Sequence, residues 1–457
     1  MPFTPWKAEL RTLAKLALPV VLAELGWMLQ GVVDVVMVGK LGPSAIAAVA
    51  LGNALYYPIA LFAFGLLLGL DTVVSQAFGR GDRDACPRAL GQGVYIAFAA
   101  TVPAMLATLL PAMLLPRFGV EAVLIPPARS YLLVLMWGTL PLLLYGATRR
   151  YLQAIGEVRV ITLTFLVSNL VNWGANEVLI YGKLGLPAMG PRGSALATVI
   201  SRVGMAVLLL AYAAWHERQR HYALWRRWPA PAWAELRGLL RLGLPAALHL
   251  LVEVAAFETA TILAARISVV SLAAHQIALN YAALAFMVPL GISAAASISV
   301  GHAIGAGDPA KARRAGWLSL GLAVAFMLCS ASTFVAVPRT LIALYTRDPG
   351  VVSIGVTLLA LALAAVFAVF DAVQVVVTGA LRGMGLTRVP MLVNFAGYWL
   401  LGLPIGILLA FPLRHGVAGL WTGLSAALVA VALVLFSYWR RRSRPESVRA
   451  LNTAPLL

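Results

Sequence analysis

Seven carboxylates interrupt long apolar stretches of this 457-residue sequence, and their type and position suit them to chemistry. They are Glu24, Asp34, Asp71, Glu177, Glu253, Glu258 and Asp371. A charged side chain at the centre of a bilayer costs roughly 3 kcal/mol on insertion scales, so it usually faces a partner or a water-filled cavity. The neighbours of each acid therefore indicate whether a cation or a proton would bind there.

Asp371 lies in the segment FAVFDAVQVVVTGALRG, residues 367–383. Phe367, Gln374 and Thr378 recur at helical spacing from it and form one stripe, which is polar where lipid would favour leucine. Two interpretations stay open: a packed polar seam between helices, or a water-filled cavity with a cation or proton site. Under the second, Asp371 is retained because an ion must bind there and leave again.

Two further acids lie in the segment HLLVEVAAFETAT, residues 249–261. His249 and Glu253 are four residues apart and share one helix face, whereas Glu258 points to another face. We expect the deeper Glu253 to face the cavity. Glu258 is expected to form a structural ion pair or to lie at the edge of the cavity.

The first half of the chain carries a third polar group. Trp27, Gln30 and Asp34 form one helical stripe, and a later apolar stretch carries a second stripe of amides and a hydroxyl. That second stripe consists of Thr162, Asn169, Asn172 and Asn176, with Glu177 adjacent. The two stripes suit a hydrogen-bonded cluster that holds or releases a proton. The alternative is polar contact between helices, which contributes about 0.6 to 2 kcal/mol per contact.

Membrane-spanning helices must position these residues. The chain is 61% hydrophobic and only 11% charged, which is typical of a protein whose solvent is lipid. A spanning helix needs about 20 apolar residues, and turns and charge clusters divide the chain into twelve such stretches. Their approximate bounds are 13–38, 45–78, 90–112, 127–148, 158–181, 193–215, 238–265, 271–302, 315–337, 351–380, 388–411 and 416–439. The predicted fold class is an all-α integral membrane protein.

The net charge of +18 would suit a nucleic-acid partner, but its distribution favours a membrane topology. If the N-terminus is cytoplasmic, most of the 35 Lys and Arg residues fall in loops on that same side, as the positive-inside rule requires. Arg149 and Arg150 are assigned to one of those loops, and only Arg202 falls within a span. The pattern predicts cytoplasmic termini and no nucleic-acid partner.

The two halves of the chain repeat one another. Laying residues 10–82 over residues 236–308 aligns two Leu-x-Leu-Pro helix starts and two Gly-x-Gly-Asp loops. Because a repeat of six spans preserves orientation, the halves are expected to be six-helix lobes related by a pseudo-two-fold axis along the membrane normal. The expected domains are an N-lobe at 1–215, a cytoplasmic linker at 216–235, a C-lobe at 236–445 and a cytoplasmic tail at 446–457.

Several segments of the sequence resemble the multidrug and toxic compound extrusion (MATE) family, specifically its NorM-like branch. They are LQGVVDVVMVGKLG (29–42), NEVLIYGKLG (176–185), LVEVAAFETAT (251–261), SLAAHQIALNYAALAFMVP (271–289) and FDAVQVVVTGALRGMG (370–385). The resemblance implies twelve helices in two lobes in the bacterial inner membrane. It also implies secondary active multidrug efflux, in which cationic amphipathic compounds leave in exchange for Na⁺ or H⁺ by alternating access.

The resemblance also assigns site residues. Glu253 and Asp371 fall on the C-lobe acidic pair linked to cation coupling, where Na⁺ is a candidate ligand, and Asp34 falls on the N-lobe aspartate linked to protonation. The expected substrate cavity comprises Gln276, Gln374, Thr378, Asn172, Asn176, Gln30 and Phe286. Phe367 departs from the family pattern, which often has Tyr there, and the lost hydroxyl weakens the case for a Tyr-assisted Na⁺ site. No cofactor beyond the coupling ion is expected, and a monomer is assumed.

Three other functions compete with antiport. A lipid-linked precursor flippase of the same superfamily is the nearest, but such proteins tend to have a strongly basic cavity, whereas acids outnumber bases in these spans. An intramembrane enzyme is disfavoured because the sequence has neither HExxH nor Gly-x-Ser-x-Gly. A passive channel stays open, and uphill transport would distinguish it from an antiporter.

Overall fold

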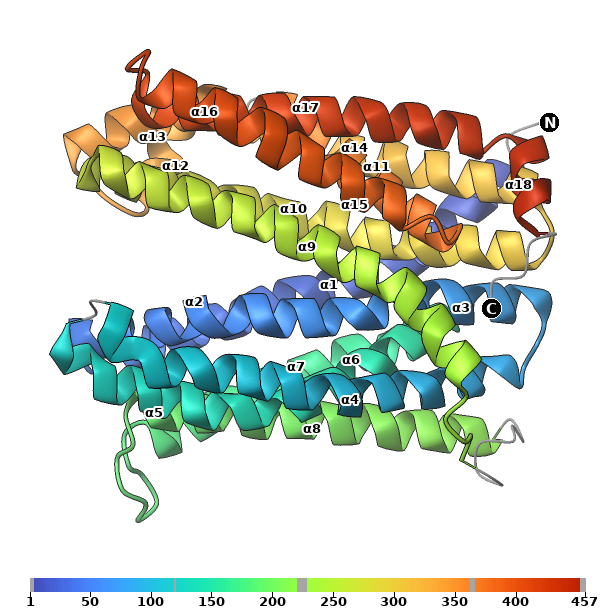
Figure 1. Ribbon diagram of the computed structural model, residues 1–457, viewed down its shortest axis with the longest axis horizontal. Coiled ribbons are helices and arrows are strands. Elements are labelled where there is room, and N and C mark those ends of the chain that lie inside the picture. The colour runs from blue at the N-terminus through green and yellow to red at the C-terminus, as the bar shows by residue number, and fades with distance from the viewer. Residues whose placement is uncertain (1–3, 119–120, 220–227, 362–365, 453–457) are drawn as a thin grey trace. The chain divides into compact units, whose positions relative to one another are not determined.

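The computed structural model describes residues 4–118, 121–219, 228–361 and 366–452, and within these ranges it contains helices and no strand (Figure 1). Eleven helical stretches of this described part are long and apolar enough to cross a membrane. The predicted fold class, an all-α membrane protein, is therefore confirmed. Parts of the predicted linker and tail, residues 220–227 and 453–457, lie outside the described residues.

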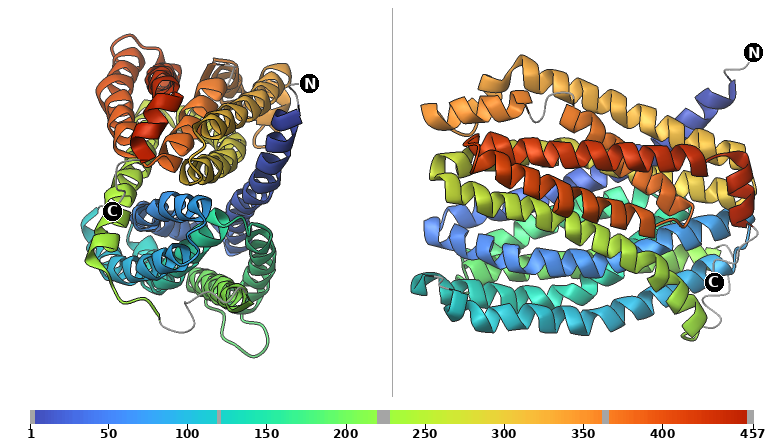
Figure 2. Two further views of the ribbon diagram at one scale, coloured as in Figure 1. Left: turned by 90° about the vertical axis from the view of Figure 1, so that its right-hand side faces the viewer. Right: turned by 45° about the horizontal axis from the view of Figure 1, so that its top comes forward.

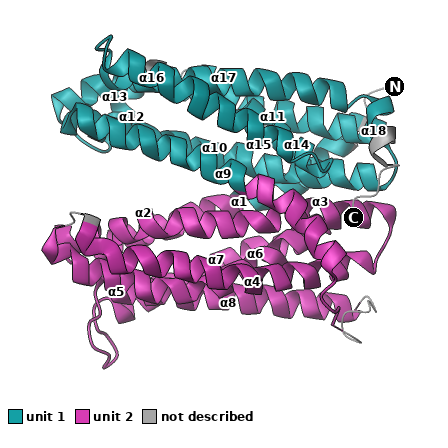
Figure 3. Cartoon of the chain, in the orientation of Figure 1, with its two compact units in different colours: residues 1–21, 248–455 teal, residues 22–247, 456–457 magenta. Residues whose placement is uncertain are grey.

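The chain forms two compact units, coloured separately in Figure 3. Unit 1 consists of Met1–Val21 with Leu248–Pro455, and unit 2 contains Leu22–Ala247. The boundaries differ from the expected lobes because they fall inside two long helices, α1 (Thr4–Gly39) and α9 (Trp233–Ile267), rather than in the linker.

Unit 2 is a bundle of long helices whose neighbours run alongside one another (Figure 2). Its elements after α1 are α2 (Pro43–Gly65), η1 (Leu66–Leu68), α3 (Gly69–Arg80), α4 (Ala85–Leu114), η2 (Leu115–Phe118), η3 (Ala122–Leu124), α5 (Ile125–Leu135), η4 (Met136–Gly138), α6 (Thr139–Ala154), α7 (Arg159–Leu179) and α8 (Pro191–Gln219). Helix α8 packs against α5, α6 and α7, so polar side chains on its inner face meet three neighbours.

In unit 1, α14 lies among three longer helices, α10, α11 and α17. Its elements after α9 are α10 (Val269–Gly305), α11 (Pro309–Ala336), α12 (Pro338–Ala343), α13 (Pro349–Leu361), α14 (Val366–Gly383), α15 (Arg388–Phe395), the π-helical η6 (Ala396–Gly402), α16 (Leu403–Ala410), α17 (Gly416–Arg442) and α18 (Pro445–Asn452). Helix α14, which carries Asp371, packs against α10, α11 and α17. The predicted span 351–380 thus covers α13 and α14, and residues 362–365 within it lie outside the described part.

The two divided helices are built alike. Pro19 lies in α1 and Pro245 in α9, each two residues before the helix passes from one unit to the other. Proline has no backbone N–H and so removes one hydrogen bond from a helix interior. Each helix is therefore weakened close to the point at which it changes units.

Glycines at equivalent positions of the repeat pack closely against the first part of each divided helix. A Cβ at Gly291 of α10 would lie 2.9 Å from the Cα of Val21, and a Cβ at Gly65 of α2 would lie 2.6 Å from the Cα of Ala247. Only glycine permits so close an approach. The aligned sequence repeats thus reappear as matching contacts, one within each unit.

The Gly-x-Gly-Asp loops that follow α3 and α10 also match. Gly81 and Gly307 adopt left-handed φ values of 75° and 71°. One residue later, Asp82 Oδ1 accepts the backbone N–H of Ala85 at 3.0 Å, and Asp308 Oδ1 accepts that of Lys311 at 2.8 Å. Each Asp satisfies an amide of the following helix's first turn, which explains why glycine and aspartate recur together.

The assignment of Arg149 and Arg150 to a cytoplasmic loop is wrong. Both lie on α6, which continues to Ala154, and both are buried. Arg149 forms an ion pair with Glu24, and Arg150 Nη1 lies 3.3 Å from Asp71 Oδ2. Because each guanidinium meets a carboxylate, the helix can hold both charges away from water.

Candidate functional site

In unit 2, Asp34 is held by hydrogen-bond donors from two other helices. Its Oδ1 accepts from Asn176 Nδ2 of α7 at 2.6 Å, and its Oδ2 accepts from Thr198 Oγ1 of α8 at 3.1 Å. Asn176 Nδ2 also donates to Asn172 Oδ1, one turn earlier, at 3.2 Å. The predicted cluster of an aspartate with two asparagines is therefore present, and each carboxylate oxygen has a neutral donor.

The same three helices extend this polar network by one turn. Gln30 Nε2 donates to Ser201 Oγ at 3.1 Å, and Ser201 Oγ donates to the backbone oxygen of Ser168 at 3.1 Å. Gln30 lies four residues before Asp34 and Ser201 three residues after Thr198, so helical periodicity puts both pairs at one level. We call Gln30, Asp34, Asn172, Asn176, Thr198 and Ser201 the Asp34 cluster.

Arg202 borders the Asp34 cluster on α8. Its Nη1 donates to the Tyr56 hydroxyl at 2.7 Å, and its guanidinium carbon lies 5.1 Å from the centre of that ring. The Tyr56 hydroxyl lies 3.2 Å from Thr139 Oγ1. Arg202 is within electrostatic range of Asp34 but forms no ion pair with it among the described residues. A fixed positive charge thus lies near the aspartate without neutralising it by direct contact.

In unit 1, Glu253 of α9 lies among side chains from α14 and α15. Gln374 Nε2 lies 3.5 Å from Glu253 Oε1, and His249 Nε2 lies 3.5 Å from Glu253 Oε2. Asn394 Nδ2 lies 3.2 Å from the same His249 nitrogen. The predicted helix face shared by His249 and Glu253 is therefore present, and Asn394 completes it. We call Glu253, His249, Gln374, Asn394 and Asp371 the Asp371 cluster.

Asp371 is buried, at 7% exposure, and lies within electrostatic range of Glu253. No hydrogen bond or ion pair to its carboxylate is found in the described part of the chain. The buried Oε1 of Gln374 and Oγ1 of Thr378, on the same helix, also have no hydrogen-bond partner. An ionised carboxylate offers about four acceptor sites. This cluster therefore has oxygen ligands to spare for a cation or a proton.

A π-helical segment supports the Asp371 cluster. The N–H of Leu403 bonds to the oxygen of Tyr398, five residues back, and the next residue, Pro404, has no N–H to offer. Trp399 Nε1 donates to the backbone oxygen of Val252 at 3.1 Å, beside Glu253. This hydrogen bond connects the π-helical segment to α9 next to Glu253.

Four other predicted residues are placed differently. Gln276 is exposed, whereas its neighbour His275 is buried between Thr261 Oγ1 at 2.9 Å and Trp421 Nε1 at 3.0 Å. Phe286 is half-buried against the apolar core of unit 1. Glu258 is exposed and has no ion pair among the described residues, and Glu177 pairs with Lys183 at 2.6 Å. None of the four belongs to either cluster by a described contact.

The oxygen atoms around Asp371 suit a hard cation better than a transition metal. Among the described residues, no group of three or more His, Cys, Asp or Glu side chains is placed to hold a metal ion. The oxygen atoms that could coordinate a cation are those of two carboxylates, one amide and one hydroxyl. Phe367 packs its ring 5.6 Å from that of Trp421, so this side of α14 adds apolar surface and no further oxygen.

Several supporting residues were missed by the sequence reasoning. On α8, Thr198 and Ser201 recur at helical spacing with Ser194 and Arg202, so the sequence could have predicted this polar stripe. Asn394 and Trp399 gave no such signal, because single polar side chains in an apolar stretch do not reveal which helix they meet.

A family model described as MatE matches residues 19–176 and 245–408. A probable multidrug resistance protein NorM from Mesorhizobium japonicum is 38% identical over 456 residues, which are 97% of this chain and 96% of that protein. The multidrug resistance protein MdtK from Yersinia enterocolitica is 36% identical over 434 residues, covering 93% of this chain and 94% of that protein.

Solved structures share the fold. The eukaryotic MATE transporter AtDTX14 superposes with a TM-score of 0.87 at 21% identity, covering 98% of this chain and 100% of that one. A multidrug resistance MATE family transporter in an outward-facing conformation has a TM-score of 0.87 at 20% identity, covering 98% and 97%.

Proposed function

Because this chain belongs to the MatE family and is a multi-pass membrane transporter rather than an enzyme, we propose that it exports cationic amphipathic compounds by cation-coupled antiport. Relatives named as multidrug resistance proteins support a drug-like substrate. The proposed location is the bacterial inner membrane, with both termini cytoplasmic, and the proposed state is a monomer.

The Asp371 cluster carries this proposal. It brings the buried Asp371 and the half-buried Glu253 within electrostatic range of each other, and neither forms an ion pair with Arg or Lys in the described residues. Glu9, Glu24 and Asp71, in contrast, each pair with an arginine. Two like charges in a site of low polarity are costly, so a bound cation or proton is strongly favoured there.

Exchange follows from competition for that charge. If the coupling ion and the organic cation bind the same carboxylates, or favour opposite states of the transporter, each promotes release of the other. In this scheme Asp371 and Glu253 hold the coupling ion or the substrate, and Gln374 and Thr378 supply neutral oxygens. Either Na⁺ or H⁺ fits these ligands as the exchanged cation. A Na⁺ site would have one oxygen fewer than in relatives with Tyr, because Phe367 has no hydroxyl.

Asp34 has a separate role in this proposal. Its two donors, Asn176 and Thr198, stabilise the charged carboxylate, and Arg202 nearby adds a positive field. A proton on Asp34 would compete with these contacts, so a change in helix packing that lengthens them would favour protonation. Asp34 would thus take up or release a proton as the lobes change conformation.

Transport in liposomes tests the proposal. Purified protein is reconstituted, and ethidium movement is followed under an imposed Na⁺ gradient and then under a pH gradient at equal membrane potential. We expect uphill movement that is lost in Asp371→Asn and kept in Asp348→Asn, a matched change of an exposed aspartate in unit 1. The gradient that drives movement identifies the coupling ion.

Two outcomes would contradict the proposal. Downhill movement alone, unaffected by either gradient, would indicate a passive channel. No ethidium movement, together with translocation of a lipid-linked pyrophosphate in the same vesicles, would indicate the flippase alternative.

A further inference from the structure

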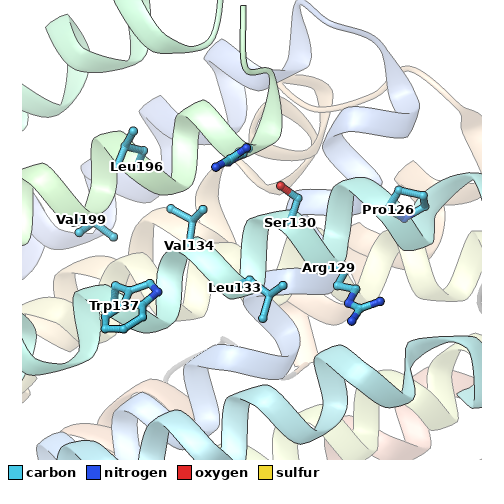
Figure 4. A pocket seen from close by; sticks show the side chains of 9 residues that line it. Pro126, Arg129, Ser130, Leu133, Val134, Trp137, Leu196 and Val199 are labelled. Carbon is cyan, nitrogen blue, oxygen red and sulfur yellow. The ribbon is translucent and has the colours of Figure 1, made fainter.

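A groove on unit 2, between α5 and α8, has the features of a lipid site. It encloses about 630 Å³ and is lined by residues of α5, η4 and α8 alone (Figure 4). Its lining residues are Pro126, Arg129, Ser130, Leu133, Val134, Trp137, Arg192, Leu196 and Val199. All lie in one unit and outside both the Asp34 and the Asp371 clusters.

The groove is polar at one end and apolar at the other. Along α5 and the following η4, Arg129, Leu133 and Trp137 recur every four residues and all line the groove. Figure 4 shows Pro126, Arg129 and Ser130 towards one end of the view, and Leu196, Val199 and Trp137 towards the other. The spacing from Arg129 to Trp137 corresponds to about 12 Å along a helix.

The second helix repeats this order. On α8, Arg192 comes first and Leu196 and Val199 follow at helical spacing. Helices α5 and α6 form one continuous stretch and the chain reverses direction before and after α7, so α5 and α8 run parallel. Because Arg129 and Arg192 each lie near the start of their helix, the two residues belong to the same end of the groove. Its lining therefore passes from two cations and a hydroxyl to aliphatic and indole surface.

The two arginines have no carboxylate partner. Both are exposed, neither forms an ion pair among the described residues, and no acid lines the groove. Unlike Arg149 and Arg150, they are free to bind an anion. Arginine presents a planar fork of donors that matches phosphate oxygens, and its charge disfavours the cationic substrates proposed above.

We propose that this groove binds an anionic phospholipid, with the phosphate held by Arg129 and Arg192 and an acyl chain lying along Leu133, Val134 and Val199. The exposed Trp137, at 65% exposure, lies against the acyl chain. Charge complementarity selects the headgroup, and the apolar half of the groove selects a lipid over a free anion. The proposal holds whether or not the protein is a drug exporter.

Lipid binding by the full-length protein in detergent tests this. Thermal unfolding and native mass spectrometry are compared with phosphatidylglycerol, with phosphatidylcholine of the same acyl chains, and with inorganic phosphate. We expect phosphatidylglycerol to raise Tm and to be retained as a bound molecule, phosphatidylcholine to act much more weakly, and phosphate to have no effect at equal concentration.

Variants locate the site. Arg129→Gln and Arg192→Gln should each weaken phosphatidylglycerol binding about tenfold, as expected for losing a charge-assisted hydrogen bond. Arg339→Gln, which removes an exposed arginine from α12 of unit 1, is the matched control and should bind as the wild type does. Val199→Trp fills the apolar half without changing charge, and it should also prevent lipid binding.

The result that overturns the proposal is equally specific. Equal stabilisation by phosphatidylglycerol and phosphatidylcholine, or phosphatidylglycerol binding that survives both arginine changes, would exclude this site. Stabilisation by inorganic phosphate as strong as that by the lipid would leave an anion site without a lipid. If the arginine variants fail to fold, unchanged lipid binding by Val199→Trp would still refute the proposal.

Discussion

The acidic side chains inside the two units differ in the protein partners that they have. In unit 2, Glu24 and Asp71 meet arginines, and Asp34 accepts hydrogen bonds on both of its oxygens. In unit 1, Glu253 lies 3.5 Å from Gln374 and from His249 and interacts with Asn394, but it meets no Arg or Lys in the described residues, and Asp371 has no hydrogen bond there. The contrast indicates that the acids of unit 2 are satisfied by protein groups, whereas Asp371 in unit 1 has no such partner among the described residues, as the proposed ion site requires.

Removing an arginine from unit 2 should have the largest effect on stability. Arg149→Gln removes the buried partner of the half-buried Glu24, so we expect the free energy of unfolding to fall by about 3 kcal/mol. Thermal unfolding in detergent, followed by tryptophan fluorescence, measures this. Arg159→Gln, at an exposed position on α7, is the control and should change stability little. Equal Tm values for both variants would refute a stabilising ion pair.

Removing the charge of Asp371 should have the largest effect on ligand binding. Asp371→Asn is expected to weaken ethidium binding in detergent about tenfold or more, because a hydrogen bond or ion contact to a charged group contributes about 1.5–3 kcal/mol. Fluorescence titration measures the affinity. Asp34→Asn should keep its ethidium affinity within about twofold, since that carboxylate is already satisfied by protein donors. Equal losses in the two variants would remove the distinction between the clusters.

The same two variants should shift stability in opposite directions. Asp34→Asn offers one acceptor oxygen where two donors converge, so we expect a loss of about 1–3 kcal/mol. Asp371→Asn removes a like charge from the neighbourhood of Glu253 and should raise Tm of the ligand-free protein. Thermal unfolding in buffer without drug provides the comparison. A lower Tm for both variants would indicate that Asp371 has a protein partner after all.

Loss of a single donor should have the smallest effect. Thr198→Val removes one hydrogen bond to Asp34 and should lower the free energy of unfolding by about 1 kcal/mol. Thr422→Val on α17 is the control, because each threonine hydroxyl lies within hydrogen-bond distance of the carbonyl four residues back, but only that of Thr198 also lies within hydrogen-bond distance of a carboxylate. The two variants are compared by thermal unfolding, and indistinguishable Tm values would show that the contact to Asp34 contributes nothing.

Helical periodicity predicted the polar stripes well. The spacing of Gln30 and Asp34 on one helix, and of Asn172 and Asn176 on another, predicted a cluster that the structure contains. Charge counting failed at Arg149 and Arg150, because two adjacent arginines are typical of a loop unless their partners are known. The partners, Glu24 and Asp71, lie far away in the chain, and no local pattern identifies them.

The sequence by itself determined the class of protein and the repeat, since hydrophobicity, loop charge and matched Gly-x-Gly-Asp loops are local properties. Only the tertiary structure decided which acids are neutralised and which are not. It also decided that α1 and α9 each divide between the two units. Both depend on contacts between residues distant in the chain, such as Gly65 with Ala247, and in an apolar sequence many such pairings look alike until the helices are packed.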